Sequence, residues 1–147
     1  MASRLHDLWV RTPVPVETLA GVVAGAVAQR LRPLRLPAPA RPVGLALVLT
    51  GLALVVEAVR ERGPGSVDAP AGLTTEGLHG RSRNPMYVGL TLAQVGLAGA
   101  TRNGWALVLS PVSAAALHLA VLREERWLRN RFGAAYQGYA ARVPRYW

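Results

Sequence analysis

The stretch VGLALVLTGLALVVEAV, residues 43–59, is almost entirely apolar and carries no charge before Glu57. An apolar run of roughly 17 to 25 residues is long enough for an α-helix to cross a lipid bilayer. The whole chain of 147 residues is 51% hydrophobic, and its mean hydropathy is positive, at +0.22. The sequence therefore predicts a helical membrane protein, and its length fits a single domain over residues 1–147.

Three further apolar segments accompany this run. MYVGLTLAQVGLAGA (86–100) and WALVLSPVSAAALHLAVL (105–122) lie after it, and VPVETLAGVVAGAVAQRL (14–31) lies before it and carries Glu17 near its start. Asp7 and Glu17 suit the start of a secretory signal peptide badly, so we interpret the first segment as a membrane helix. We predict an all-α integral membrane protein with about four transmembrane helices, at about 14–31, 43–59, 86–101 and 104–122.

The basic residues indicate an orientation. The net charge of +9 comes from arginine alone, and the chain contains no lysine. With the N-terminus in the cytoplasm, twelve arginines fall on the cytoplasmic side and five on the other, namely Arg30, Arg32, Arg35, Arg41 and Arg102. This bias agrees with the positive-inside rule and favours contact with anionic lipid headgroups over nucleic acid. We expect a protein of the cell inner membrane, with both termini, the loop 61–84 and the tail 123–147 in the cytoplasm.

The sequence gives no support for a metal site or for thiol chemistry. The chain has no cysteine, and its three histidines, His6, His79 and His118, show no spacing typical of metal ligands. We therefore expect no metal site.

The stretch GRSRNPMYVGL, residues 80–90, places polar side chains at the start of an apolar segment. Pro85 disfavours the helical conformation for Asn84, and Asn and Pro are favoured at the N-cap and the first helical position. We therefore expect the third helix to begin here. Its free amides, with Arg81 and Arg83 beside them, could bind a carboxylate or a phosphate. The simpler interpretation is a capped helix whose arginines contact lipid.

The tail REERWLRNRFGAAYQGYAARVPRYW begins at Arg123. Glu124, Leu128 and Phe132 are spaced by four, which places a carboxylate on the face of an apolar stripe. In the simpler alternative, the glutamates form surface pairs such as Glu125 with Arg129, each worth only tenths of a kcal/mol. We expect the tail to form an amphipathic helix after the fourth membrane helix.

Gly133 should end that helix, because glycine is favoured just past a helix end. A short second helix would then carry Tyr136, Tyr139 and Arg142 back toward the membrane surface. Each aromatic residue could equally serve as an interfacial anchor.

The two polar stretches together resemble the isoprenylcysteine carboxyl methyltransferase and phospholipid methyltransferase families. The resemblance rests on RNPMYVG (83–89), REERWLRNRFGAAYQGY (123–139) and RVP (142–144), and covers the C-terminal two thirds, including GSVDAP in the loop. It implies a helical membrane enzyme that uses S-adenosylmethionine. Its motifs assign cofactor binding to His79, Arg83, Asn84, Pro85, Tyr87, Glu124 and Glu125, and catalysis to Tyr139 and Arg142.

The chemistry of these residues suits that cofactor. Its carboxylate would meet the start of the third helix and the arginines, and its ammonium and ribose hydroxyls would meet the glutamates. Arg142 could anchor an acceptor carboxylate or a lipid phosphate. Two positions depart from the family pattern: His79 stands where many relatives have Tyr, and Gly138 stands where relatives often have Glu.

We therefore expect methyl transfer to an amphiphilic acceptor, such as a lipid, an isoprenoid or a prenylated molecule, at the boundary of membrane and cytosol. Membrane lipids would be partners. One alternative is a small four-helix exporter with Glu17, and also Glu57, as proton-coupled sites. A noncatalytic membrane scaffold and a nicotinamide-dependent membrane reductase are the others.

Overall fold

The computed structural model describes residues 15–63, 65–66, 69–70 and 72–147. The expectations for the N-terminal segment, including Arg4, His6, Asp7 and Arg11, lie outside the described residues. So does part of the GSVDAP stretch. The described helices are α2 (Val16–Leu31), α3 (Ala40–Arg62), the 3-10 helix η1 (Gly77–Gly80), α4 (Pro85–Ala100), α5 (Gly104–Phe132) and α6 (Ala134–Arg142).

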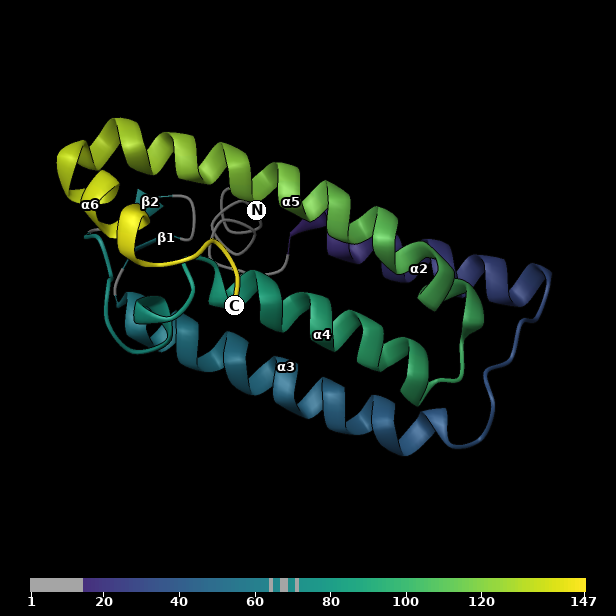
Figure 1. Ribbon diagram of the computed structural model, residues 1–147. Helices are drawn as coiled ribbons and strands as arrows, with labels where there is room; N and C mark the ends of the chain where they lie inside the picture. Colours follow the sequence, from purple (N-terminus) through teal and green to yellow (C-terminus); the bar gives the residue numbers. More distant parts are fainter. Residues whose placement is uncertain (1–14, 64, 67–68, 71) are drawn as a thin grey trace, which may run out of the picture.

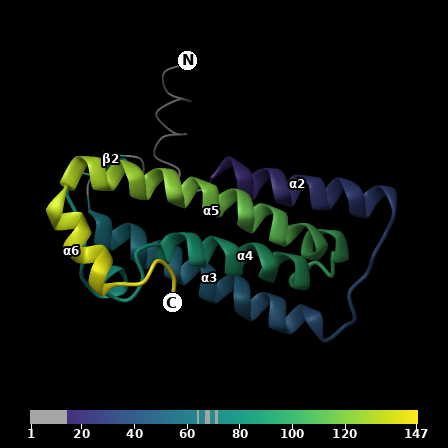
Figure 2. The same cartoon turned by 45° about the horizontal axis from the view of Figure 1, so that its top comes forward.

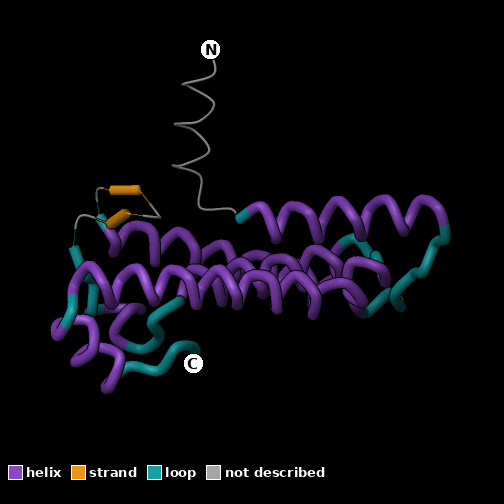
Figure 3. Tube along the Cα trace, turned by 90° about the horizontal axis from the view of Figure 1, so that it is seen from above, coloured by secondary structure: helices purple, strands orange, loops and turns teal. Residues whose placement is uncertain are grey.

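The predicted helical architecture is confirmed. In the long loop between α3 and α4, two-residue strands β1 (Gly65–Ser66) and β2 (Ala69–Pro70) pair antiparallel. Figure 3 shows this hairpin set apart from the helices. Among the described helices, α3 and α5 are long and apolar enough to cross a membrane.

Four helices run alongside one another (Figure 1), with α4 between α3 and α5 and with α2 against α5. The α3–α4 contact is close because glycines face each other across it. A Cβ atom at Gly89 would lie 2.6 Å from the carbonyl oxygen of Gly51, so a side chain there would force the backbones apart. Small residues at such contacts are typical of membrane helix pairs.

The outer faces of the bundle are apolar. Val23 of α2, Leu49 of α3 and Val112 of α5 are each at least 60% exposed. The interior between the helices holds polar side chains as well as apolar ones, including Gln94 and Ser113, each 7% exposed. Exposing such an apolar surface to water is unfavourable, whereas contact with lipid chains is not. The distribution of apolar residues therefore supports the membrane assignment.

The end of the bundle remote from α6 is closed by two short connections, 32–39 and 101–103. The N–H of Leu36 donates to the carbonyl of Arg102, and the N–H of Gly104 donates to that of Leu34. Asn103 caps α5 by accepting a hydrogen bond from the N–H of Ala106 (2.9 Å). These contacts fix the turn predicted between the third and fourth helices.

Helix boundaries differ from the sequence expectation in two places. The long loop was expected to start at residue 61, but α3 continues through Arg62. α5, which contains the predicted fourth membrane helix, continues without a break into the tail, so that Glu124 and Glu125 lie on α5 itself. The predicted end at Gly133 (φ 52°) and the second short helix, α6, are both confirmed.

Candidate active site

One end of the bundle collects the polar residues singled out in the sequence. The C-terminal end of α3, η1, the start of α4, the last third of α5 and α6 meet there (Figure 2). After α6, the C-terminal segment 143–147 folds back over the start of α4, where the N–H of Arg83 donates to the carbonyl of Pro144 (2.9 Å). Segments far apart in the chain therefore share one site.

Asn84 occupies the N-cap position of α4 and Pro85 the first helical position, as predicted. The expected capping hydrogen bond is absent, however: among the described residues, no backbone N–H donates to the side chain of Asn84. The side-chain amide instead donates to Oε1 of Glu125 (3.2 Å) and to the carbonyl of Arg145 (3.2 Å). The role of Asn84 is thus to bridge α4 to α5 and to the C-terminal segment.

Glu125 is the centre of a buried charge cluster that we call the Glu125 cluster: Arg83, Asn84, Glu125 and Arg145. Its carboxylate, only 3% exposed, accepts from Nε of Arg83 (3.1 Å) and from Nη2 of Arg145 (3.0 Å). Arg83 also donates to the carbonyls of Ala140 (2.8 Å) and Val143 (3.2 Å). The cluster therefore ties α4, α5, α6 and the C-terminal segment together.

The surface pairing of Glu125 with Arg129 suggested by the sequence is wrong. Glu125 turns inward to Arg83 and Arg145, whereas Arg129 is exposed. The reason is that the C-terminal segment covers this face of α5 and supplies a closer cation. A buried carboxylate needs such partners, since leaving it unpaired costs several kcal/mol.

Glu124 forms a second polar group with Arg62 and Tyr87. Its carboxylate is ion-paired with Arg62 at the end of α3 and accepts a hydrogen bond from the hydroxyl of Tyr87 (2.7 Å). The side chain of Glu124 is 10% exposed and that of Arg62 is 17% exposed. Both glutamates are therefore largely buried. They are adjacent on α5 but have different partners.

His79 is held against α3 by Glu61. The Nδ1 atom of His79 lies 2.9 Å from Oε2 of Glu61, which also accepts the N–H of His79 (3.3 Å). Burial lowers the pKa of the His79 imidazole, and the nearby Arg62 adds to this shift, while the Glu61 carboxylate opposes it. His79 is therefore neutral at neutral pH.

Tyr139 is also buried, and its hydroxyl donates to the carbonyl of His79 (2.6 Å). Its ring packs edge-on against that of Tyr136, with 6.0 Å between the centroids. Burial raises the pKa of each phenol to about 12. The hydroxyl of Tyr136 is fully buried and has no hydrogen-bond partner among the described residues.

A small hollow lies beside these groups. It is lined by Arg62, Gly72, Leu73, Thr74, His79, Arg83, Leu128 and Tyr139. It thus joins the described part of the long loop to residues of α3, η1, α5 and α6 and to Arg83, which precedes α4.

Arg142 is the one predicted site residue that the structure does not bring into this group. It is exposed at the end of α6 and takes part in none of the hydrogen bonds or ion pairs of the described residues. Its assignment to the acceptor stays a prediction.

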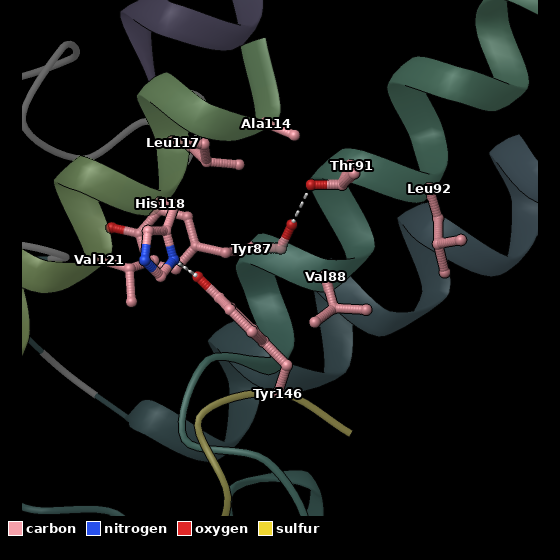
Figure 4. Close-up of a pocket in the computed structure, with 9 residues that line it drawn as sticks. All are labelled: Tyr87, Val88, Thr91, Leu92, Ala114, Leu117, His118, Val121 and Tyr146. Carbon is pink, nitrogen blue, oxygen red and sulfur yellow. Dashed lines mark hydrogen bonds between the residues drawn. The ribbon is translucent and has the colours of Figure 1, made fainter. Parts of the chain in front are cut away.

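A larger apolar cavity of about 280 Å³ lies one to two helical turns deeper in the bundle, between α4 and α5. Figure 4 shows the residues that line it: Tyr87, Val88, Thr91, Leu92, Ala114, Leu117, His118, Val121 and Tyr146. Tyr87 belongs both to this wall and to the Glu124 group. The charged end and the apolar cavity are therefore contiguous.

Several residues of the site were missed in the sequence. Arg145 and Tyr146 follow the RVP motif directly, and Glu61 and Arg62 lie at the end of an apolar run. Tyr146 could have been suspected from its place beside the motif. The partners of Glu61 and Arg62 could not, because only the packing of α3 against η1 and α5 brings them together.

A family model described as phospholipid methyltransferase matches residues 40–135. The matched region runs from the start of α3 to the start of α6 and includes His79, the start of α4 and both glutamates. No curated protein and no solved structure matches the chain.

Proposed function

Because this chain belongs to the phospholipid methyltransferase family, we propose that it transfers a methyl group from S-adenosylmethionine to an amphiphilic acceptor in the membrane. The family implies a methyltransferase, and the cofactor and the acceptor are the proposed part. The observation that carries the proposal is the shared wall at Tyr87, which joins buried carboxylates to an apolar cavity.

The polar groups around the hollow fit S-adenosylmethionine. The carboxylate of Glu124 can take the cofactor's ammonium or ribose hydroxyls, and Arg62 and Arg83 can face its carboxylate. We assign cofactor binding to this end of the bundle, with His79, Asn84, Pro85 and Glu125 as its frame.

Two of the expected cofactor residues would act by positioning others. Asn84 and Arg83 hold the carboxylate of Glu125, and Glu125 in turn holds Arg145 of the C-terminal segment. Tyr139 fixes His79 through its carbonyl. The catalytic role expected for Tyr139 would then consist of holding the wall of the hollow, with its phenol neutral.

When bound, S-adenosylmethionine supplies an electrophilic methyl group on a positively charged sulfur. The protein's part is to align an acceptor with that methyl group and to exclude water, which can account for a large share of the rate of a displacement reaction. Val88, Leu92 and Leu117 would hold the apolar part of the acceptor. Arg142, on the exposed end of α6, would contact the acceptor's headgroup or a lipid phosphate.

We further propose that all four long helices cross the membrane, α2 and α4 together with the two longer ones. Helices α2 and α4 each have 16 residues and are therefore about 24 Å long at 1.5 Å per residue. The exposed face of α2 is apolar. The site would face the cytoplasm of a cell with the protein in its inner membrane, because most described arginines lie at that end. Membrane lipids are then the protein's partners.

The test is binding followed by transfer. Purified protein in phosphatidylcholine nanodiscs should bind S-adenosylmethionine in a calorimetric titration, with its homologue lacking the transferable methyl as a comparison ligand. Methyl-labelled cofactor should then label a component of a membrane lipid extract, identified by mass spectrometry. Absence of both binding and labelled product would contradict the enzyme and favour an exporter or a scaffold.

A further inference from the structure

We propose that His118 and Tyr146 accept the proton that the methyl acceptor loses on transfer. This inference rests on the proposed methyl transfer. It assigns a role to two residues outside the family motifs quoted above.

The cavity combines a mainly apolar lining with a hydrogen-bonded pair of polar side chains. Of its nine lining residues, most are aliphatic, and Val121 and Leu117 are almost fully buried. The Nδ1 atom of His118 on α5 lies 2.7 Å from the hydroxyl of Tyr146, which reaches in from the C-terminal segment (Figure 4). An amphiphilic molecule whose apolar chain fills the cavity could therefore place its polar group beside this pair.

The two residues together can move a proton. A neutral imidazole has one nitrogen that donates and one that accepts. When the Tyr146 hydroxyl donates to Nδ1 of His118, its oxygen can accept a hydrogen bond from the acceptor. A proton can then pass from the acceptor to Tyr146 while the phenolic proton passes to His118.

The titratable groups that face His118 across the cavity are few. They are Tyr146 of the C-terminal segment and Tyr87 of α4, and α2 and α3 contribute none of the described lining residues. Burial raises the pKa of the Tyr146 phenol. Tyr146 therefore relays a proton without ionising, and His118 is the group that stores it.

Methylation of a hydroxyl or an amine needs such a group. The bond from the acceptor's oxygen or nitrogen to the methyl carbon forms, the bond from sulfur to that carbon breaks, and the thioether leaves with the electron pair. The acceptor's proton must go elsewhere, and His118 takes it. A carboxylate acceptor carries no proton at neutral pH, so its methylation would not require the pair to accept one.

The first test measures binding without turnover. Protein labelled with ¹⁵N-histidine in phosphatidylcholine nanodiscs gives imidazole signals, and His118→Gln identifies that of His118. Decanol should shift this signal, and decane, which has no hydroxyl group, should not. Val88→Trp should abolish the shift by filling the cavity, with Ala114→Leu in its place should the first variant not fold. An unchanged signal with decanol, or an equal shift in the filled variant, overturns the proposal.

The second test measures transfer from methyl-labelled S-adenosylmethionine to a membrane lipid extract. His118→Gln, which can still hydrogen-bond Tyr146, should lower the rate about a hundredfold, and Tyr146→Phe should also lower it. Leu119→Ala, on the exposed face next to His118, is the matched control.

The product separates the possible failures. A methyl ether or an N-methyl product supports the inference, whereas a methyl ester overturns it. Cofactor binding in calorimetry should be the same in His118→Gln as in the wild type. Cofactor binding and a wild-type rate of transfer that both survive in His118→Gln overturn the inference alone, whereas absence of binding and transfer in the wild type overturns the proposed function itself.

Discussion

Arg145 holds the carboxylate of Glu125 through three hydrogen bonds of 3.0 to 3.1 Å, although the two residues stand twenty positions apart in the chain. The pairing fastens the C-terminal segment across α5. Because the Glu125 carboxylate is only 3% exposed, its partners hold a charge that water cannot reach. The stability of the site therefore depends on each of them.

Glu125→Gln should destabilise the fold. The change leaves the buried guanidinium of Arg83 without its counter-ion, which typically costs about 3 to 5 kcal/mol. Thermal unfolding in detergent, followed by circular dichroism, measures the loss. Glu57→Gln is the control, because the Glu57–Arg60 pair is exposed and should contribute less than about 1 kcal/mol. Equal stability of the two variants would show that the Glu125 cluster is dispensable.

Glu124→Gln should act mainly on the cofactor. Glu124 is paired with Arg62, which lines the hollow, and accepts a hydrogen bond from Tyr87, so we expect a bound ammonium or hydroxyl to share its carboxylate with them. Loss of one such charged hydrogen bond costs about 1.5 to 3 kcal/mol, or roughly tenfold to a hundredfold in affinity for S-adenosylmethionine. Calorimetric titration measures it. Unaltered affinity in this variant would leave the glutamate with a structural role alone.

Asn84→Asp separates two roles of the residue. Asp is as good an N-cap as Asn, but it cannot donate to Glu125 and would place a second carboxylate 3.2 Å from the first. We therefore expect a loss of thermal stability near pH 8 that partly recovers as the pH falls and one carboxylate takes a proton. Asn84→Leu should also destabilise the protein, by about 1 to 3 kcal/mol. A stable Asn84→Asp protein would restore the simple capping role.

The stability of the protein should depend on pH through His79. Burial lowers the pKa of its imidazole, so below the usual value of about 6.5 the unfolded chain binds a proton that the folded protein does not. The contribution of His79 is therefore fully present above about pH 6.5 and is lost as the pH falls below it.

The measurement compares wild type with His79→Gln in thermal unfolding at about pH 7.5 and pH 5.5. Glu61 and Arg62 of α3 and Glu124 of α5 face the ring and titrate or stay charged in both proteins. The wild type should lose more stability on acidification than the variant. A larger loss in His79→Gln would show that His79 is stabilised as a cation.

The proposed orientation can be checked with single cysteines, because the chain has none of its own. Arg129→Cys lies on the exposed face of α5 at the end with the site, and Ala38→Cys lies in the exposed connection at the opposite end. In intact cells, a membrane-impermeant maleimide should label Ala38→Cys directly and Arg129→Cys only after permeabilisation. The reverse pattern would turn the site to the outside.

Much of the helical plan was predictable from the sequence, because apolar runs, Asn-Pro and Gly133 are local signals. The start of α4 at Pro85 and the end of α5 at Gly133 agree with the prediction. The side-chain partners were not predictable in the same way. Asn84 stands at an N-cap, yet it binds Glu125, since tertiary contacts outweighed the local hydrogen bond.

The inner and outer faces of α5 show the same limit. The spacing placed Glu124 on an apolar stripe and suggested an ion pair between Glu125 and Arg129. In the structure the C-terminal segment covers Glu125, and Arg145 pairs with it instead. A helical period shows which residues share a face, and only the packing of the rest of the chain decides what covers that face. The predicted roles of His79, Tyr87 and Arg142 toward ligands stay predictions.

The adjacency of Arg145 and Tyr146 gives this site a thermodynamic property. One residue belongs to the Glu125 cluster, and the next closes the apolar cavity. A ligand that repositions Arg145 also repositions the cavity wall, so the two ligands would bind cooperatively. Such a coupling free energy is reciprocal: whatever factor the cofactor adds to the affinity for the acceptor, the acceptor must add to the affinity for the cofactor.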